Sequence, residues 1–85
     1  MAVYKVLIKP SAVKEIELTP KKDRQRIIKK IRSLSSDPRP FGSEKLSGEE
    51  KYRIRQGRYR IVYSIADSER TVLIVKVGHR GEVYR

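Results

Sequence analysis

A cluster of basic residues between positions 51 and 60 is the feature of this sequence best suited to chemistry. Five positive charges lie within ten residues, with no acid among them: Lys51, Arg53, Arg55, Arg58 and Arg60. Arg53 and Arg55 are two positions apart and share one face of a predicted strand, and Arg60 on the adjoining strand can share that face. Guanidinium groups bind phosphate oxygens in pairs and stabilise charge that grows in the transition state. A solvated strand face shows the same alternation, but interspersed glutamates would then relieve the repulsion. The cluster therefore favours an anionic ligand such as a phosphodiester.

The C-terminal segment contains a second set of candidate groups. His79 is a possible acid or base, Arg80 a phosphate ligand, and Tyr84 a phenol that can stack on a nucleobase or move a proton. Structural alternatives exist for two of them, since a histidine that ends a strand is often hydrogen-bonded within the fold and a terminal tyrosine often docks as a hydrophobe. The role of this segment depends on whether the fold brings it to the arginines.

A third basic group lies on a predicted helix. Its candidate RNA contacts are Lys21, Lys22, Lys29 and Lys30. The simpler interpretation is the solvent face of an amphipathic helix. Lys21 and Lys22 would occupy the first turn, however, where the helix dipole favours acids, and this mild cost indicates a second surface for an anionic partner.

Apolar periodicity predicts the elements that position these groups. Strands are expected at 2–8, 52–56, 59–66 and 71–77, and helices at 11–18 and 19–35. The order β-α-α-β-β-β predicts an α+β fold in which a helical hairpin packs on a small antiparallel sheet. A chain of 85 residues has room for one core, so residues 1–85 are expected to form a single domain.

Capping residues predict how the two helices begin. Ser11 is expected to cap the first helix, and Thr19 the second, with Pro20 at its first helical position. The side chains expected to face the core are Ala12, Val13, Ile16 and Leu18 from the first helix, and Ile27, Ile28, Ile31 and Leu34 from the second.

Composition narrows the class of partner. The formal net charge is +11 and the sequence pI about 10.3, which attracts polyanions. No cysteine is present, one histidine cannot build a zinc site, and the acids are scattered, so neither a metal nor a cofactor is expected. No apolar run approaches the length of a membrane span. These features predict a cytoplasmic protein without a membrane partner.

Several short motifs in a fixed order carry a resemblance to a known family. They are Tyr52-Arg53-Ile54-Arg55, Gly57-Arg58-Tyr59-Arg60-Ile61-Val62-Tyr63, Val77-Gly78-His79-Arg80 and Glu82-Val83-Tyr84. Segments 12–15, 37–40 and 46–48 are also similar to segments at corresponding places. Together they resemble the RelE toxins of the RelE/ParE superfamily over nearly the whole chain.

The resemblance implies the toxin of a type II toxin-antitoxin system. Such a toxin is a metal-independent, ribosome-dependent endoribonuclease that cleaves mRNA in the ribosomal A site by 2′-OH attack and so inhibits translation. A RelB-like antitoxin with an acidic, amphipathic segment would silence it in a hetero-oligomeric complex. The resemblance places catalytic residues at Arg53, Arg55, Arg60, Arg80 and Tyr84.

The first two of these positions are lysines in the family, and the change affects the mechanism. Arginine is a poor general base because its pKa lies above about 12. Two solutions stay open. Either His79 or Tyr84 moves the proton, or the arginines act through positioning and electrostatics on RNA that the ribosome holds in line.

Two other functions fit the same sequence. A ParE-like toxin shares the fold but acts on DNA gyrase and lacks the nuclease residues, so Arg60, Arg80 and Tyr84 together argue against it. A non-catalytic RNA-binding or ribosome-associated domain would need the basic surface but no proton-transfer group.

Overall fold

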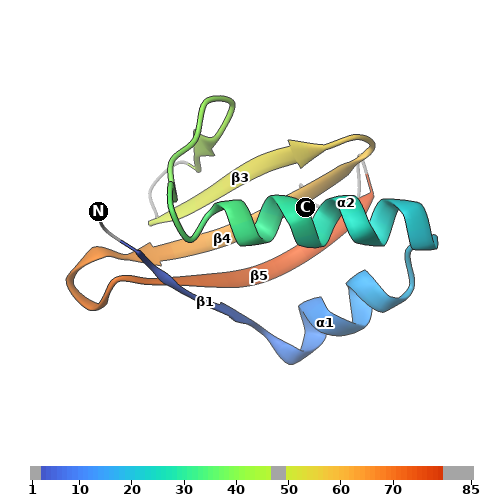
Figure 1. Ribbon diagram of the computed structural model, residues 1–85, viewed down its shortest axis with the longest axis horizontal. Coiled ribbons are helices and arrows are strands. Elements are labelled where there is room, and N and C mark those ends of the chain that lie inside the picture. Colours follow the sequence, from blue (N-terminus) through green and yellow to red (C-terminus); the bar gives the residue numbers. More distant parts are fainter. Residues whose placement is uncertain (1–2, 47–49, 80–85) are drawn as a thin grey trace.

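The computed structural model describes residues 3–46 and 50–79, which form a five-stranded sheet with both helices on one face (Figure 1). The elements in chain order are β1 (Lys5–Ile8), α1 (Pro10–Glu17), α2 (Lys21–Ser33), β2 (Glu44–Lys45), β3 (Lys51–Gln56), β4 (Tyr59–Ala66), a 3₁₀ turn (Asp67–Glu69) and β5 (Thr71–His79). The two-layer α+β architecture predicted from the sequence is confirmed. None of the helices in these two ranges has the length and apolar character needed to cross a membrane.

The sheet is mixed, whereas an antiparallel sheet was expected. Its strand order is β1-β5-β4-β3-β2, and β1 runs parallel to β5 while the other neighbours are antiparallel. The two helices form a crossover that carries the chain from β1, at one edge, to β2 at the other. The meander that follows brings β5 back beside β1 in the same direction. Strand β2, which has two residues, is too short to show an alternating pattern in the sequence.

The core lies between the helices and one face of the sheet. The α2 stripe supplies Ile27, Ile31 and Leu34, which are fully or almost fully buried, while Ile28 is only partly buried. Alternate residues of β3 and β4 meet this stripe, as the period of two in the sequence predicted. They are Tyr52 and Ile54 from β3 and Ile61, Tyr63 and Ile65 from β4.

The short helix differs from its prediction at both ends. It begins at Pro10, so Ser11 lies inside the first turn and does not cap it. Ala12 and Ile16 are buried as expected, but Val13 is partly exposed and Leu18 is 86% exposed. The reason is that α1 ends at Glu17, and Leu18 therefore falls beyond the last residue of the buried helical stripe.

Thr19 also has a different role from the predicted cap of α2. Its hydroxyl donates a 2.6 Å hydrogen bond to the carbonyl of Ile16 in the preceding helix, and α2 has no side-chain cap. Helix α2 begins at Lys21 after Pro20, and the Arg24 amide donates to the Pro20 carbonyl at 2.8 Å. Thr19 thus closes the C-terminus of α1 instead of opening α2.

A β-bulge in β5 sets the side-chain alternation at its C-terminal end. Val62 pairs with Lys76 but the next residue, Tyr63, pairs with Ile74, which leaves Val75 as an extra residue in β5. Because one residue is skipped, Val77 returns to the core side although it lies three positions after Ile74. The bulge therefore decides which residues of β5 face the helices.

Candidate functional site

The arginines of the predicted site lie on the sheet face opposite the helices. Lys51, Arg53 and Arg55 alternate with buried residues of β3, and the register places Arg60 of β4 directly opposite Arg55. We call the surface formed by Lys51, Arg53, Arg55 and Arg60 the arginine face. Arg53, Arg55 and Arg60 therefore lie on one face of the sheet, as strand alternation predicted.

The Arg55–Arg60 pair places two positive charges directly opposite each other on the arginine face. Like charges directly opposite each other on neighbouring strands destabilise a sheet. An anion that binds both guanidinium groups removes this repulsion and gains charge-assisted hydrogen bonds. The next partner of Arg60 across the sheet is Gly78 of β5, which adds no side chain to this row. The two helices pack on the other face of the sheet, so neither helix stands between a phosphate and this pair.

Glu44 of β2 is a member of the arginine face that the sequence did not reveal. Arg53 donates to Glu44 Oε1 from Nε at 2.8 Å, and its Nη2 lies 2.7 Å from the same oxygen. Hydrogen bonding to Arg53, with further attraction from Arg53, Arg55 and Arg60, lowers the pKa of Glu44. Glu44 lies nine residues before Arg53, on a strand of only two residues. The pattern of residues 51–60 therefore did not predict this contact.

Two hollows flank the arginines. One, of about 320 Å³, lies among Gly42, Ser43, Glu44, Arg53 and Arg55. The other, of about 140 Å³, lies at the β3–β4 turn, where Arg58 joins Arg55 and Arg60. Arg58 is exposed in this turn, so it extends the basic surface beyond the strands.

His79 does not share the arginine face, contrary to the expected grouping of catalytic residues. It pairs with Tyr59, which alternates in phase with the buried Ile61 and Tyr63, and so lies toward the helices. The His79 and Tyr59 rings meet edge to face with centroids 5.4 Å apart. The other two C-terminal candidates, Arg80 and Tyr84, lie outside the described residues.

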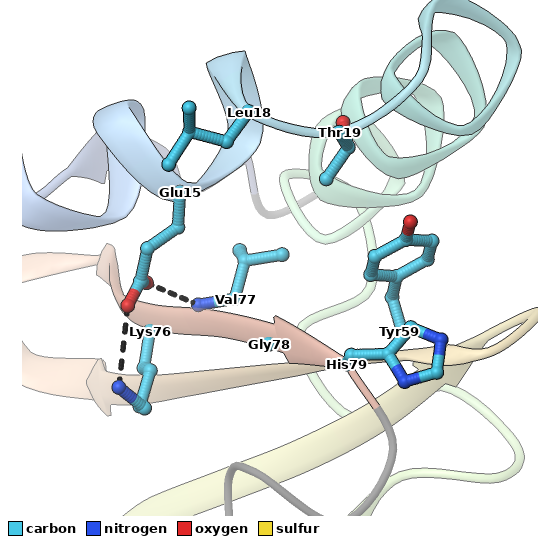
Figure 2. Close-up of a pocket in the computed structure, with 8 residues that line it drawn as sticks. All are labelled: Glu15, Leu18, Thr19, Tyr59, Lys76, Val77, Gly78 and His79. Atoms are coloured by element: carbon cyan, nitrogen blue, oxygen red, sulfur yellow. Dashed lines mark hydrogen bonds and ion pairs between the residues drawn. The ribbon is translucent and has the colours of Figure 1, made fainter.

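His79 instead lines a cavity of about 320 Å³ beside α1, at the edge of β5 (Figure 2). The pairing of β5 with β1 ends at Ile74, and Glu15 of α1 contacts the edge of β5 beyond that residue. The Glu15 carboxylate accepts a 2.8 Å hydrogen bond from the Val77 amide and a 3.2 Å bond from Lys76 Nζ. The acid therefore satisfies a backbone donor that an edge strand would otherwise leave to solvent or to another chain.

The basic residues of α2 lie on the helical side, away from the arginine face. Lys29 and Lys30 line a groove of about 410 Å³ together with Arg26, Ser33 and Gln56 of β3. Lys21 and Lys22 are exposed in the first turn. The predicted RNA contacts are thus divided between two surfaces. Within residues 3–46 and 50–79, no cluster of three or more His, Cys, Asp or Glu side chains could hold a metal ion.

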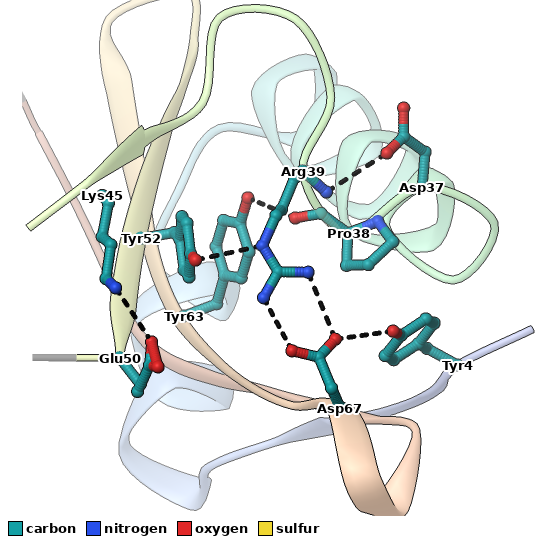
Figure 3. Close-up of polar contacts among 9 residues, drawn as sticks. All are labelled: Tyr4, Asp37, Pro38, Arg39, Lys45, Glu50, Tyr52, Tyr63 and Asp67. Carbon is teal, nitrogen blue, oxygen red and sulfur yellow. Dashed lines mark hydrogen bonds and ion pairs between the residues drawn. The ribbon is translucent and has the colours of Figure 1, made fainter.

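A polar network, which we call the Arg39 clasp, fixes the loop that leads to β2 (Figure 3). It consists of Arg39, Asp67, Tyr4 and Tyr52. Arg39 donates to the Asp67 carboxylate at 2.8 and 3.2 Å and to the Tyr52 hydroxyl at 3.0 Å. Tyr4 donates to Asp67 at 2.7 Å. Hydrogen bonds from Arg39, then from Tyr4, lower the pKa of Asp67 to about 2.

Tyr63 of β4 holds the same loop through a second contact with the sheet. Its hydroxyl donates a 2.9 Å bond to the Pro38 carbonyl, and its ring stacks on Tyr52 with centroids 5.9 Å apart. Burial raises the pKa of Tyr63 to about 12. With both ends of the 37–43 segment tied to the sheet, Gly42 turns the chain at a φ of +95° and delivers Glu44 to Arg53.

Comparison with known proteins identifies the family. A model described as the ParE toxin of a type II toxin-antitoxin system, parDE, matches residues 6–84. Toxin RelG of Mycobacterium tuberculosis is 38% identical over 55 residues, which are 61% of each protein. A putative RelE-like toxin of Escherichia coli is 30% identical over 95% of this chain and 90% of its own length. The crystal structure of the toxin-antitoxin complex RelBE2 from Mycobacterium tuberculosis matches with a TM-score of 0.84 and 27% identity, over 96% of this chain and 97% of that chain. The chain therefore belongs to the RelE/ParE family of type II toxin-antitoxin toxins, and its relatives are RelE-like.

Proposed function

We propose that this protein is a ribosome-dependent endoribonuclease that inhibits translation by cutting mRNA in the ribosomal A site. The observation that carries the proposal is the arrangement of Arg53, Arg55 and Arg60 on the sheet face opposite the two helices, with two of them directly opposite each other. RelE-like relatives over most of the chain support the same activity. The proposed localisation is the cytoplasm, where mRNA and ribosomes meet.

The reaction is attack of a ribose 2′-oxygen on the adjacent phosphorus, which breaks the bond to the 5′-oxygen and leaves a cyclic phosphate. The 2′-OH loses a proton to a base, and the leaving 5′-oxygen gains one from an acid. Arg55 and Arg60 stabilise the charge on the non-bridging oxygens, since the register places the two residues directly opposite each other on neighbouring strands. The arginines position the phosphate and do not move protons.

The C-terminal residues enter the proposal through the family resemblance. Arg80 would add a fourth guanidinium group, and Tyr84 would act as the acid or as a stacking platform. His79 is left out of the proposed site because the register turns it toward the helices. The second basic surface, on α2, is proposed to contact ribosomal RNA through Lys29 and Lys30, with Lys21 and Lys22 at the start of the helix.

An antitoxin is the proposed protein partner, because several of the similar solved structures are toxin-antitoxin complexes. The net charge of +11 calls for a partner with an acidic segment. Such a segment would cover the arginine face and so exclude RNA from it. A hetero-oligomer of toxin and antitoxin is the expected resting form.

The experiment that tests the nuclease is cleavage of mRNA on purified translating ribosomes, with new 5′ ends mapped and single-turnover rates measured. Arg60→Ala should lower the cleavage rate about 100-fold or more, the scale for losing one preorganised charge-stabilising group. Arg70→Asn is the matched control. It removes one positive charge beyond the other end of β4, and asparagine accepts the left-handed backbone of residue 70, whose φ is +48°.

Each outcome has a distinct meaning. Full activity in Arg60→Ala, or an equal loss in Arg70→Asn, would contradict the arginine site. A wild-type protein that cuts nothing on ribosomes would contradict the nuclease itself. The ParE-like alternative makes DNA gyrase the target in that case, and inhibition of gyrase supercoiling would support it. Ribosome binding without cleavage would support the non-catalytic RNA-binding alternative.

A further inference from the structure

Glu44 is an acid that lies against the basic side chains of the arginine face. Arg53 directs two nitrogens, Nε and Nη2, at a single oxygen of this carboxylate, at 2.8 and 2.7 Å. A non-bridging phosphate oxygen is also an anionic acceptor and can take charge-assisted hydrogen bonds from the same two nitrogens. Glu44 therefore occupies the position on Arg53 that an RNA phosphate would take.

The exposure of the pair shows that the contact can exchange. The Glu44 side chain is 61% exposed and that of Arg53 is 28% exposed. Exposed ion pairs contribute little to stability, so a competing anion can replace the carboxylate at small cost. A phosphate placed among Arg53, Arg55 and Arg60 gains attraction from three cations and would displace an acid that is bonded to one.

The loop geometry shows that Glu44 is held at this position. The Arg39 clasp and the Tyr63–Pro38 bond fix residues 37–43 against the sheet, and Glu44 then pairs in register with Arg53. A carboxylate on a loosely attached loop would move away from an incoming polyanion. Glu44 is instead fixed beside Arg53 through backbone pairing, so it stays within reach of this guanidinium group.

We propose that Glu44 is a built-in competitor for phosphate at Arg53, which weakens the binding of RNA to the arginine face. The inference rests on the proposed function, because it takes RNA phosphate as the anion that replaces the carboxylate. An ordinary cross-strand ion pair, by contrast, would only stabilise β2 and would leave RNA affinity unchanged.

The test is the affinity of the intact protein for a short 2′-O-methyl RNA, which cannot be cut by 2′-OH attack, measured by fluorescence anisotropy. Glu44→Gln should bind about 3- to 10-fold more tightly than wild type, because the amide keeps the shape but not the charge of the competitor. Glu44→Ala removes the same charge by a different substitution and should also increase the affinity. Thermal unfolding of each variant verifies that it is folded.

Glu50→Gln is the matched control. It removes an equal charge from the same region, where Glu50 pairs with Lys45 at 3.2 Å and makes no contact with the arginines among the described interactions. Its affinity should stay within about 2-fold of wild type. The double variant Glu44→Gln/Arg53→Ala completes a cycle, and the gain from Glu44→Gln should disappear when Arg53 is absent.

Equal or weaker binding by both Glu44 variants would overturn the inference. An equal gain in Glu50→Gln, or a gain that persists without Arg53, would overturn it too, since either result indicates a general effect of net charge. Cleavage on ribosomes is scored separately. A wild-type protein that cuts mRNA while Glu44→Gln binds no tighter contradicts only this inference, and a gain in affinity without any cleavage contradicts only the nuclease.

Discussion

Asp67 accepts three hydrogen bonds in the Arg39 clasp, two from Arg39 and one from Tyr4. Both donors are far from Asp67 in the sequence, and together they connect the residue before β1, the loop after α2 and the β4–β5 turn (Figure 3). The ionised carboxylate is the form that accepts these bonds. Protonation of Asp67 should therefore loosen the loop that holds Glu44.

Asp67→Asn should lower the free energy of unfolding at neutral pH, and the difference from wild type should vanish in acid. The folded-state pKa of about 2 lies below the usual value of about 3.9 for an unfolded aspartate. The stabilisation is therefore fully present above about pH 4 and is lost as the pH falls toward 2. Urea unfolding of both proteins across this range measures it. Glu69→Gln, in the same turn, is the charge control, and a pH-independent difference for Asp67→Asn would contradict the argument.

Single residues were predictable where a local period determined their direction. The spacing of Arg53, Arg55 and Arg60 indicated one face because strand alternation requires only neighbouring residues. Glu44 and the Arg39–Asp67 pair were not predictable, since both contacts depend on how distant segments meet. The structure therefore corrected the impression that the arginine face is without acids.

The β3–β4 hairpin is the element that aligns the arginines. A two-residue turn, Gly57–Arg58, sets the register in which Arg55 meets Arg60. Gly57 has a φ of +61°, which L-residues other than asparagine and aspartate rarely adopt. Any change that shifts this turn by one residue would send the arginines to opposite faces of the sheet.

Gly57→Ala should reduce the free energy of unfolding by about 1 kcal/mol, the cost of placing a Cβ in a left-handed backbone. No atom lies within 4 Å of the added Cβ, so the loss comes from the backbone and not from a clash. Gly57→Asn should cost less, because asparagine tolerates this region. Chemical denaturation of wild type and the two variants measures the order of their free energies of unfolding. Equal losses for alanine and asparagine would indicate a different cause.

Most elements were predictable, and the exceptions share a physical reason. Helix α2 and strands β3 and β4 show long, regular patterns, and the structure confirms them. Strand β2 and the parallel pairing of β1 with β5 were missed because neither leaves a periodic signal in the sequence. The bulge at Val75 was also missed, and with it the side of the sheet on which His79 lies.

On the scale of the molecule, the sheet separates two basic surfaces. The arginine face lies on one side, and the groove of Arg26, Lys29 and Lys30 lies with the helices on the other. One RNA strand on the arginine face would leave the α2 groove available for a second RNA segment. This arrangement fits a small protein that binds mRNA and ribosomal RNA together.

Binding to ribosomes should fall steeply as the salt concentration rises, because each neutralised phosphate adds about 0.7 to 0.9 to the slope of the log–log plot. Arg55→Ala and Lys29→Ala should each reduce this slope by about one phosphate contact, whereas Arg70→Asn should leave it unchanged. Sedimentation with ribosomes between low and physiological salt supplies the slopes. A flat dependence for the wild type would contradict an electrostatic interface.

The parallel pairing of β1 with β5 also determines when the protein can complete its fold during synthesis. The β3–β4 hairpin joins neighbours in the sequence and can form as soon as both strands are made. Strand β1, although made first, has its only strand partner within the described residues in β5, which is made last of the strands. Contacts of such long sequence separation form late and slowly. During synthesis, the two strands of the arginine hairpin are therefore both available for pairing before β1 can reach its partner.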